Sequence, residues 1–184
     1  MLDHLIEIIK EDKANLERFK NLFDEKEILS KTILLHEGDT ATHLHFIKKG
    51  CLRMWFNKEG KDITFQFFFE GKAVSSIESF ITGQPSIFTI ESIEPSTIVS
   101  ISSEDWKQIL QAFPEIKEGF QQILFQRFRN YAQLFLSRIK DTPKERYEVL
   151  VKNHPEIIQR IPQHYIASYL GITPISLSRI RNRR

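Results

Sequence analysis

Near its C-terminal end the chain reads Gln163-His-Tyr-Ile-Ala-Ser-Tyr-Leu-Gly-Ile-Thr-Pro-Ile-Ser-Leu-Ser-Arg-Ile-Arg181. Two short helices that cross need a small residue at the crossing and a turn residue tolerant of left-handed backbone, and Ala167 and Gly171 supply them. Thr173 fits the N-cap of the second helix, and Pro174 fits its first position. The apolar residues that would join the helices are Ile166, Leu170, Ile172, Leu177 and Ile180. The segment therefore predicts a helix-turn-helix.

The second helix of this motif is expected to enter the major groove of DNA by its N-terminal half. Arg179 would donate two hydrogen bonds to a guanine, whereas Gln163, His164, Arg183 and Arg184 would contact phosphates. The residues predicted to bind DNA are Thr173, Ile175, Ser176, Ser178, Arg179, Arg181, Gln163 and His164. The alternative interpretation is a structural helical hairpin with no role in DNA binding.

Charge is distributed unevenly along the 184 residues, although the net charge is only +2. Residues 1–140 hold 18 Lys and Arg against 20 Asp and Glu, whereas residues 141–184 hold 8 against 4. The last 28 residues contain five arginines and no acidic residue. Such an end is expected to bind a polyanion, although a solvated basic surface has the same composition.

A long helix is predicted upstream of this basic end, from Pro114 to about Lys140. Its apolar residues are Ile116, Phe120, Ile123, Leu124, Phe128, Tyr131, Leu134, Phe135 and Ile139. They form a stripe wider than contact with one β-domain needs, so part of the helix is expected to pack against a second copy of the chain. Packing within one chain is the alternative. Thr142 and Pro143 then begin the next predicted helix, which runs to about Asn153.

From about Glu27 the pattern is one of short strands separated by glycines. Five of the seven glycines are spaced 10 to 12 residues apart, at positions 38, 50, 60, 71 and 83. The β-rich runs lie at 33–35, 44–47, 52–56, 63–69, 87–93 and 98–101. Turn signals at this spacing indicate an antiparallel roll. Flanking helices are expected over residues 2–23 and, capped by Ser102 or Ser103, as far as Ala112.

The order of these elements resembles the Crp/Fnr family, named after the cyclic-AMP receptor protein and the fumarate–nitrate regulator. The resemblance is carried by Glu37-Gly38-Asp39, Phe46-Ile47-Lys48-Lys49-Gly50, Glu59-Gly60-Lys61 and the segment from Ile166 to Ile180. The chain looks most like short members without a β-wing from Bacteroidetes-type bacteria. The resemblance implies an α+β fold with three parts: a β-roll sensor of the cyclic-nucleotide-binding jelly-roll type with flanking helices (1–113), a long dimerisation helix (114–140) and a helix-turn-helix domain (141–184).

The resemblance also implies partners. Double-stranded operator DNA would be bound by a homodimer joined through residues 114–140, with half-sites about 34 Å apart. RNA polymerase is a further implied partner, and an effector in the roll would tilt the long helices. No membrane contact is expected, because no stretch approaches about 20 apolar residues. No signal peptide is recognisable, so the expected location is the cytoplasm.

The nucleotide-binding cassette of the family maps onto Ser75 to Ile87, and there the chain departs from the pattern. Members that bind cyclic nucleotides hold the phosphate with an arginine, yet no arginine occurs here between Arg53 and Arg127. Because burying a phosphate without a cation is costly, the effector is expected to be an unknown small molecule other than cyclic AMP. The residues expected at its pocket are Lys72, Ser75, Ser76, Glu78, Ser79 and Ser86, with Glu78 in place of the ribose-binding acid.

Two other functions remain open. His43 and His45 lie on one face of a strand, as in cupin metal enzymes, but Lys48 and Lys49 occupy the positions of the cupin glutamate. The single Cys51 excludes an iron–sulfur site built from cysteines alone, and no nucleophile motif or phosphate loop is present, so neither catalytic residues nor a metal site is expected. The second alternative is a ligand sensor whose basic tail contacts protein instead of DNA.

Overall fold

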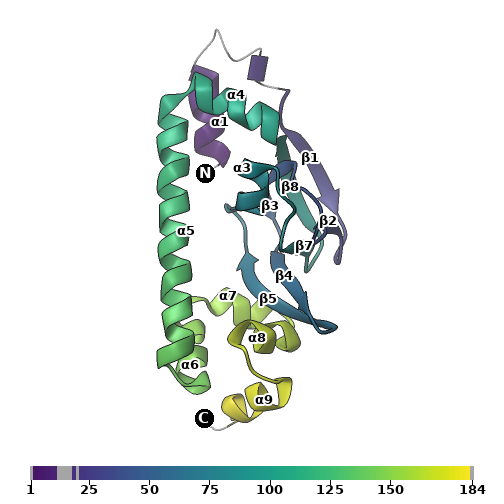
Figure 1. Cartoon of the computed structure of the whole chain (residues 1–184), viewed down its shortest axis with the longest axis vertical. Helices are drawn as coiled ribbons and strands as arrows, with labels where there is room; N and C mark the ends of the chain where they lie inside the picture. The colour runs from purple at the N-terminus through teal and green to yellow at the C-terminus, as the bar shows by residue number, and fades with distance from the viewer. Residues whose placement is uncertain (1, 12–17, 20, 183–184) are drawn as a thin grey trace. The chain divides into compact units, whose positions relative to one another are not determined.

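The computed structural model describes residues 2–11, 18–19 and 21–182 of the chain (Figure 1). The chain divides into two compact units. The first comprises Met1–Phe56 and Phe67–Glu118, and the second comprises Asn57–Gln66 and Gly119–Arg184. The second unit therefore combines the tip of a β-hairpin, residues 57–66, with a C-terminal segment that is remote in sequence. This segment of ten residues is called the hairpin tip below.

The strands of the described residues form two antiparallel sheets of four strands each, which confirms the predicted roll. The first sheet has the order β1-β8-β3-β6, with bounds Asp24–Ile28, Ser96–Ser102, His43–Lys49 and Ala73–Val74. The second has the order β2-β7-β4-β5, with bounds Ile33–Leu35, Thr89–Ser92, Leu52–Lys58 and Lys61–Phe68. One of the predicted glycine turns has a clear steric cause. Gly50 has φ 99°, and a Cβ there would collide with Ser96.

All six predicted β-rich runs contain a strand, but the structure adds elements that the pattern does not show. Strand β1 reads Asp-Glu-Lys-Glu-Ile, is largely exposed and pairs with β8 at the edge of its sheet. Its charged side chains suit an edge strand and carry no alternation of apolar residues. Strand β6 and the short helix α3 (Ile77–Thr82) were not predicted either.

The expected helix over residues 2–23 is wrong at its C-terminal end. Helix α1 covers Leu2–Glu11, and residues 12–17 and 20 lie outside the described part of the chain. Residues 21–23 are not helical. There the Leu22 N–H donates to the Phe19 carbonyl in a turn. The Phe19 ring is buried and packs edge-on against the Phe113 ring, with the two ring centroids 5.6 Å apart.

The helices that follow the roll agree with the predicted boundaries. Helix α4 (Ser103–Ala112) is capped by Ser102, whose Oγ accepts the Asp105 N–H at 3.0 Å. Helix α5 covers Pro114–Lys140, and α6 covers Pro143–Asn153 behind a capping box of Thr142 and Glu145. Helix α7 (Pro155–Arg160) was not predicted. None of the described helices is long and apolar enough to cross a membrane.

Candidate nucleic-acid interface

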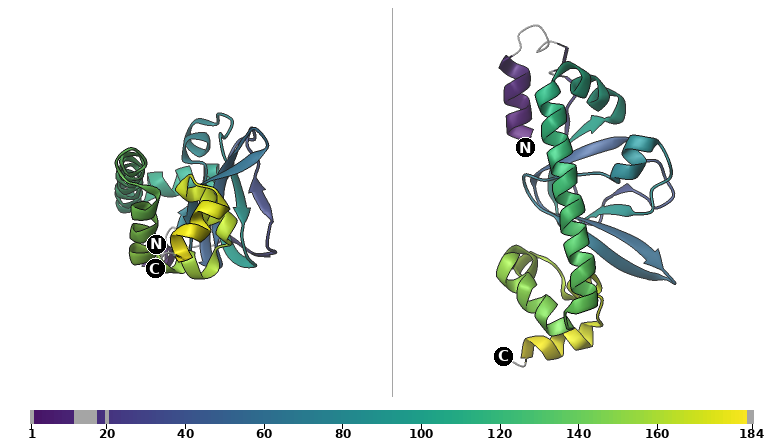
Figure 2. Two further views of the ribbon diagram at one scale, coloured as in Figure 1. Left: turned by 90° about the horizontal axis from the view of Figure 1, so that it is seen from below. Right: turned by 60° about the vertical axis from the view of Figure 1, so that its left-hand side comes forward.

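Two helices joined by a tight turn occupy the predicted segment, α8 (Gln163–Leu170) and α9 (Pro174–Asn182) (Figure 2). Gly171 ends α8 in the left-handed conformation, with φ 69° and ψ 34°. Its N–H donates to the Ser168 carbonyl at 3.0 Å, and the Ile172 N–H donates to the Ala167 carbonyl at 3.0 Å. Ala167 is fully buried, as a close approach of the two helices requires.

Helix α9 begins at the predicted cap. The Ser176 N–H donates to Thr173 Oγ1 at 3.1 Å, and Pro174 occupies the first helical position. The helix is held by its buried face, where Leu177 has no exposed surface. The small core beneath α8 and α9 contains Tyr147, Leu150, Ile157, Ile161, Ile166, Ala167, Leu170 and Leu177. Burial of Leu177 leaves the opposite face of α9 to solvent.

The residues predicted to bind DNA differ in accessibility. The exposed ones are Thr173, Ile175, Ser178 and Arg179 at α9, and Gln163 and His164 at α8. Ser176 and Arg181 are half-buried. The Ser176 hydroxyl shares a hydrogen bond of 3.0 Å with the Thr173 hydroxyl, so both take part in the cap. Arg183 and Arg184 lie outside the described residues.

Two arginines that were not predicted hold the C-terminal end of α8. Arg138 on α5 donates from Nη2 to the Tyr169 carbonyl at 2.9 Å. Arg146 on α6 donates from Nη2 to the Leu170 carbonyl at 3.0 Å and from Nη1 to the Asp141 carbonyl at 2.7 Å. Cations at these carbonyls satisfy acceptors that the helix leaves open and favour the negative end of its dipole. No local sequence signal could have identified these pairs, because the partners are 31 and 24 residues apart.

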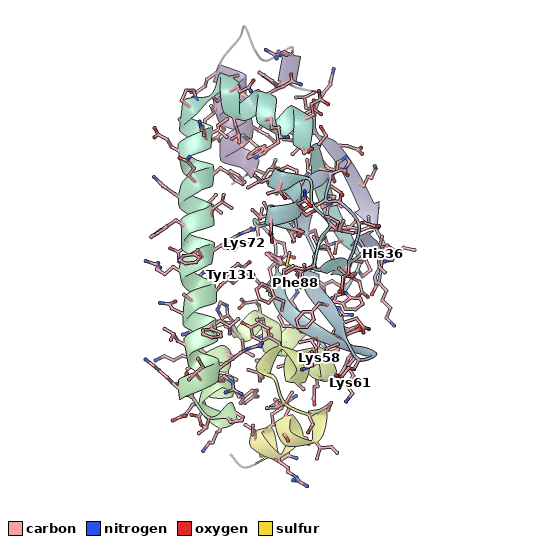
Figure 3. All side chains as sticks on the ribbon, viewed as in Figure 1. His36, Lys58, Lys61, Lys72, Phe88 and Tyr131 are labelled. Atoms are coloured by element: carbon pink, nitrogen blue, oxygen red, sulfur yellow. The ribbon has the colours of Figure 1, made fainter. Side chains whose placement is uncertain are left out.

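The hairpin tip belongs to the same unit as this motif. Figure 3 shows Lys58 and Lys61 on it and Tyr131 on α5. The Phe65 ring lies 5.0 Å from the Tyr131 ring. Burial raises the pKa of the Tyr131 hydroxyl, although Arg127 opposes the shift. The tip is therefore part of the packing around the helices, although it belongs to the strands of the roll in sequence.

Part of helix α5 presents an apolar face to solvent. Phe125, Phe128, Phe135 and Ile139 are each between 65% and 69% exposed, and the exposed Ala132 lies between them. Their positions differ by three and four residues alternately, which is the spacing of a coiled-coil seam. The residues of the predicted stripe therefore lie on two faces of α5. One face is exposed, and the other contains the half-buried residues Phe120, Ile123, Leu124, Tyr131 and Leu134. The predicted stripe did not include Phe125.

The residues expected at an effector pocket lie in two environments. Ser75, Ser76, Ser79 and Ser86 are buried, whereas Lys72 and Glu78 are exposed. Three of the buried hydroxyls donate to backbone carbonyls of the roll itself: Ser75 to His43, Ser79 to Gln84 and Ser86 to Phe88. Ser76 precedes α3 without a side-chain capping hydrogen bond. These hydroxyls serve the loop, which needs partners for its buried backbone groups.

A cavity of about 190 Å³ opens in the first unit between β2, β3 and the loop that joins them. It is lined by Ile33, Leu34, Leu35, His36, Asp39, Thr40, Ala41, Thr42, His43, His45, Ser75 and Ile90, so Ser75 is the predicted effector residue that reaches it. His45 bonds through Nδ1 to Ser100 Oγ at 2.8 Å. Burial, then His43 and Lys26, lower the pKa of His45 from 6.5 to about 4.

The paired histidines of the cupin interpretation receive no support from the geometry. The rings of His43 and His45 lie nearly parallel with centroids 6.1 Å apart. Among the residues that the structure describes, no group of three or more histidine, cysteine or acidic side chains is arranged to hold a metal ion. A metal site therefore remains unsupported.

The arginine nearest before the cassette in sequence is already paired inside the roll. Arg53 is 2% exposed, and its Nη2 lies 2.7 Å from a carboxylate oxygen of Glu91. Its guanidinium also stacks on the Trp55 ring at 4.8 Å. Glu91 lies opposite Arg53 in the register of β4 and β7. Removal of Arg53 from this pair would leave a buried carboxylate without its cation, so Arg53 is poorly suited to bind a ligand phosphate.

Residues 25–113 match the cyclic nucleotide-binding domain family. A curated relative from Salmonella typhimurium, the cAMP-activated global transcriptional regulator CRP, is 26% identical over 88 residues, which are 47% of this chain and 42% of that protein. The human patatin-like phospholipase domain-containing protein 6 is 28% identical over 120 residues, 61% of this chain and 9% of that protein. The chain spans less than half the length of these curated relatives.

Two solved structures share the fold over nearly the whole chain. A protein described as a Crp/Fnr family transcriptional regulator, from Eubacterium rectale, has a TM-score of 0.76 at 18% identity over 94% of this chain and 82% of that one. The c-di-GMP responsive regulator CLP from Xanthomonas campestris has a TM-score of 0.74 at 17% identity over 94% of this chain and 91% of that one. At these identities the likeness shows a common fold.

Proposed function

The chain belongs to the Crp/Fnr family, and from that premise we propose that it is a homodimeric transcription regulator that binds operator DNA through α8 and α9. The observation that carries the proposal is the exposed face of α9. Thr173, Ile175 and Arg179 lie there in solvent, while Leu177 on the opposite face is fully buried. A helix fixed by one face with such side chains on the other is suited to the major groove.

Dimerisation is proposed through α5. The exposed residues Phe125, Phe128, Ala132, Phe135 and Ile139 follow the alternating spacing of three and four that two helices need to pack knobs into holes. Four large apolar side chains at more than 60% exposure are costly in water, and their burial against a second copy removes that cost. A two-fold dimer would face two half-sites about 34 Å apart.

The proposed effector is a small molecule other than cyclic AMP. Ser86, within the segment onto which the family's nucleotide-binding cassette maps, is buried and donates to the Phe88 carbonyl. Arg53 is paired with Glu91, and Lys72 is exposed. An effector would change DNA binding by favouring one arrangement of the long helices, which requires that it bind that arrangement more tightly. RNA polymerase as a partner and a cytoplasmic location belong to the same proposal.

Binding of duplex DNA at several salt concentrations tests the proposal directly. Phosphate contacts release counterions, so the logarithm of the association constant should fall linearly with the logarithm of salt concentration. Fluorescence anisotropy with a labelled random-sequence duplex measures that slope. An association that is absent at low salt, or independent of salt, would favour the sensor that acts through protein contacts.

A further inference from the structure

Ile175 is an unusual residue for an exposed position at the start of a helix. It is the second residue of α9, and 66% of its surface is exposed although its side chain is wholly apolar. The first turn of α9 contains no acidic residue, and the basic ones occur only in the last turn, at Arg179 and Arg181. The N-terminal turn therefore offers an apolar contact surface flanked by the hydroxyls of Thr173 and Ser176.

Ile175 and Arg179 lie on the same face of α9 because they are four residues apart. Four residues correspond to a rise of about 6 Å along the helix. Base pairs follow each other at about 3.4 Å along the duplex, so the two side chains would meet positions about two base-pair steps apart. In the major groove the apolar group at a base edge is the C5-methyl of thymine, and the group best matched to a guanidinium is guanine N7 with O6.

We infer that Ile175 is a specificity-determining residue that contacts the C5-methyl of a thymine, within two base pairs of the guanine contacted by Arg179. The inference rests on the proposed function and specifies the class of operator that α9 recognises. Thr173 and Ser176 discriminate weakly, because a hydroxyl accepts or donates to many base edges. Their hydroxyls also bond to each other across 3.0 Å in the helix cap. Ile175 and Arg179 therefore carry the recognition.

The test starts with selection of bound duplexes from a random-sequence library by the full chain. In the selected site each thymine is then replaced singly by deoxyuridine, which removes only the C5-methyl. At one position per half-site this replacement should weaken binding by about 4-fold, the effect of burying one methyl group, and by about 15-fold when both half-sites are changed. Replacement of each guanine by 7-deazaguanine, which lacks N7, locates the Arg179 contact.

The variant Ile175→Ala should bind the thymine and deoxyuridine duplexes with affinities that differ by less than about 2-fold, because the apolar partner of the methyl group is missing. Val149→Ala is the matched control, since Val149 is also a β-branched residue, 54% exposed, but on α6. It should retain the full sensitivity to deoxyuridine. Circular dichroism checks that both variants fold.

Each outcome is decisive. A thymine whose methyl group matters to the native protein and not to Ile175→Ala, two base pairs or fewer from the deazaguanine-sensitive position, supports the inference. A selected site with no such thymine, or with equal sensitivity in Ile175→Ala, overturns the inference and leaves DNA binding intact. Failure to bind any duplex at low salt would instead overturn the proposed function, and this inference with it.

Discussion

The Thr64 backbone N–H, in the hairpin tip, donates a hydrogen bond of 2.8 Å to the Ser168 hydroxyl on α8. The same hydroxyl donates to the Asp62 carbonyl at 2.9 Å. Thr64 has no exposed surface. A single side chain thus connects a strand of the roll to the first helix of the helix-turn-helix, and the contacts lie within one compact unit.

Ser168→Ala should loosen this attachment. Both hydrogen bonds disappear, and the buried Thr64 N–H loses its partner, which costs about 1–3 kcal/mol. Hydrogen exchange should accelerate at the Thr64 amide, and urea should unfold the variant at lower concentration. Ser178→Ala is the control, because Ser178 is exposed on α9. Unchanged exchange at Thr64 would show that the Ser168 hydroxyl does not hold the hairpin tip.

His45 should make the folded state sensitive to acid. Burial lowers the pKa of His45 to about 4 from 6.5, so the unfolded chain takes up the proton first as the pH falls. Its contribution to stability is complete above about pH 6.5, decreases between 6.5 and 4 and is lost below 4, about 3 kcal/mol in all.

The measurement for His45 is the free energy of unfolding in urea between pH 7.5 and 5. His45→Gln should show a shallower decrease than the native protein, because the carboxylates titrate in both. Thr40→Ala, at an exposed position in the same cavity, should keep the native slope, because neither side chain titrates. Equal slopes in the native protein and His45→Gln would contradict the assignment.

Phe128→Ala with Phe135→Ala should dissociate the proposed dimer. Each side chain is at least 65% exposed in the single chain, and burying a phenylalanine contributes about 1.5–3 kcal/mol. Each substitution should therefore raise the dimer dissociation constant by about 10-fold or more, which sedimentation equilibrium measures. Val149→Ala should leave it unchanged. A native chain that sediments as a monomer at all concentrations would refute the seam.

Arg179→Ala should weaken binding to the selected operator by about 1–3 kcal/mol and binding to random DNA far less. Compared with Arg179→Ala, Arg179→Lys should regain part of the affinity for random DNA, because the positive charge is retained. It should regain little of the specificity, because a lysine cannot donate two parallel hydrogen bonds to one base. Competition fluorescence anisotropy with both duplexes gives the ratio of the affinity for the selected operator to the affinity for random DNA. An equal loss on both would show that Arg179 contacts phosphates and not a base.

Cyclic AMP should not bind the chain at physiological concentrations. The buried Ser86 hydroxyl donates to backbone, and the buried Arg53 is paired with Glu91, so the phosphate would lack a buried counter-charge. Isothermal titration up to about 1 mM ligand should give no saturable heat, with the cAMP-activated regulator of Salmonella typhimurium as positive control. Saturable binding of cyclic AMP with a dissociation constant below about 1 mM would refute the proposal.

Local signals predicted most elements of the fold. Thr142 with Pro143 marked the start of α6, and Gly171 marked the turn between α8 and α9, because caps and left-handed positions restrict the residue type strongly. The charged strand β1 was missed because an edge strand with charges on both faces has no apolar alternation.

The candidate sites were predicted less completely than the fold. Exposure of Ile175 and Arg179 followed from the helix period, but the contacts of Arg138 with Tyr169 and of Ser168 with Thr64 join residues that are remote in sequence. A one-dimensional pattern contains no information on such pairs. The serines of the cassette illustrate a second difficulty, because the same hydroxyl suits a ligand or a buried backbone group, and Ser86 donates to the latter.

The second unit is discontinuous along the chain, and this matters for protein engineering. A chimera that exchanged the sensor at a single junction near residue 118 would import a foreign loop in place of residues 57–66. The foreign loop would have to pack against α8, although it lacks the residues of the native hairpin tip that contact this helix. Grafting of a new ligand specificity onto this proposed DNA-binding unit therefore calls for three junctions, at 56/57, 66/67 and 118/119, so that the native hairpin tip stays with its own α8.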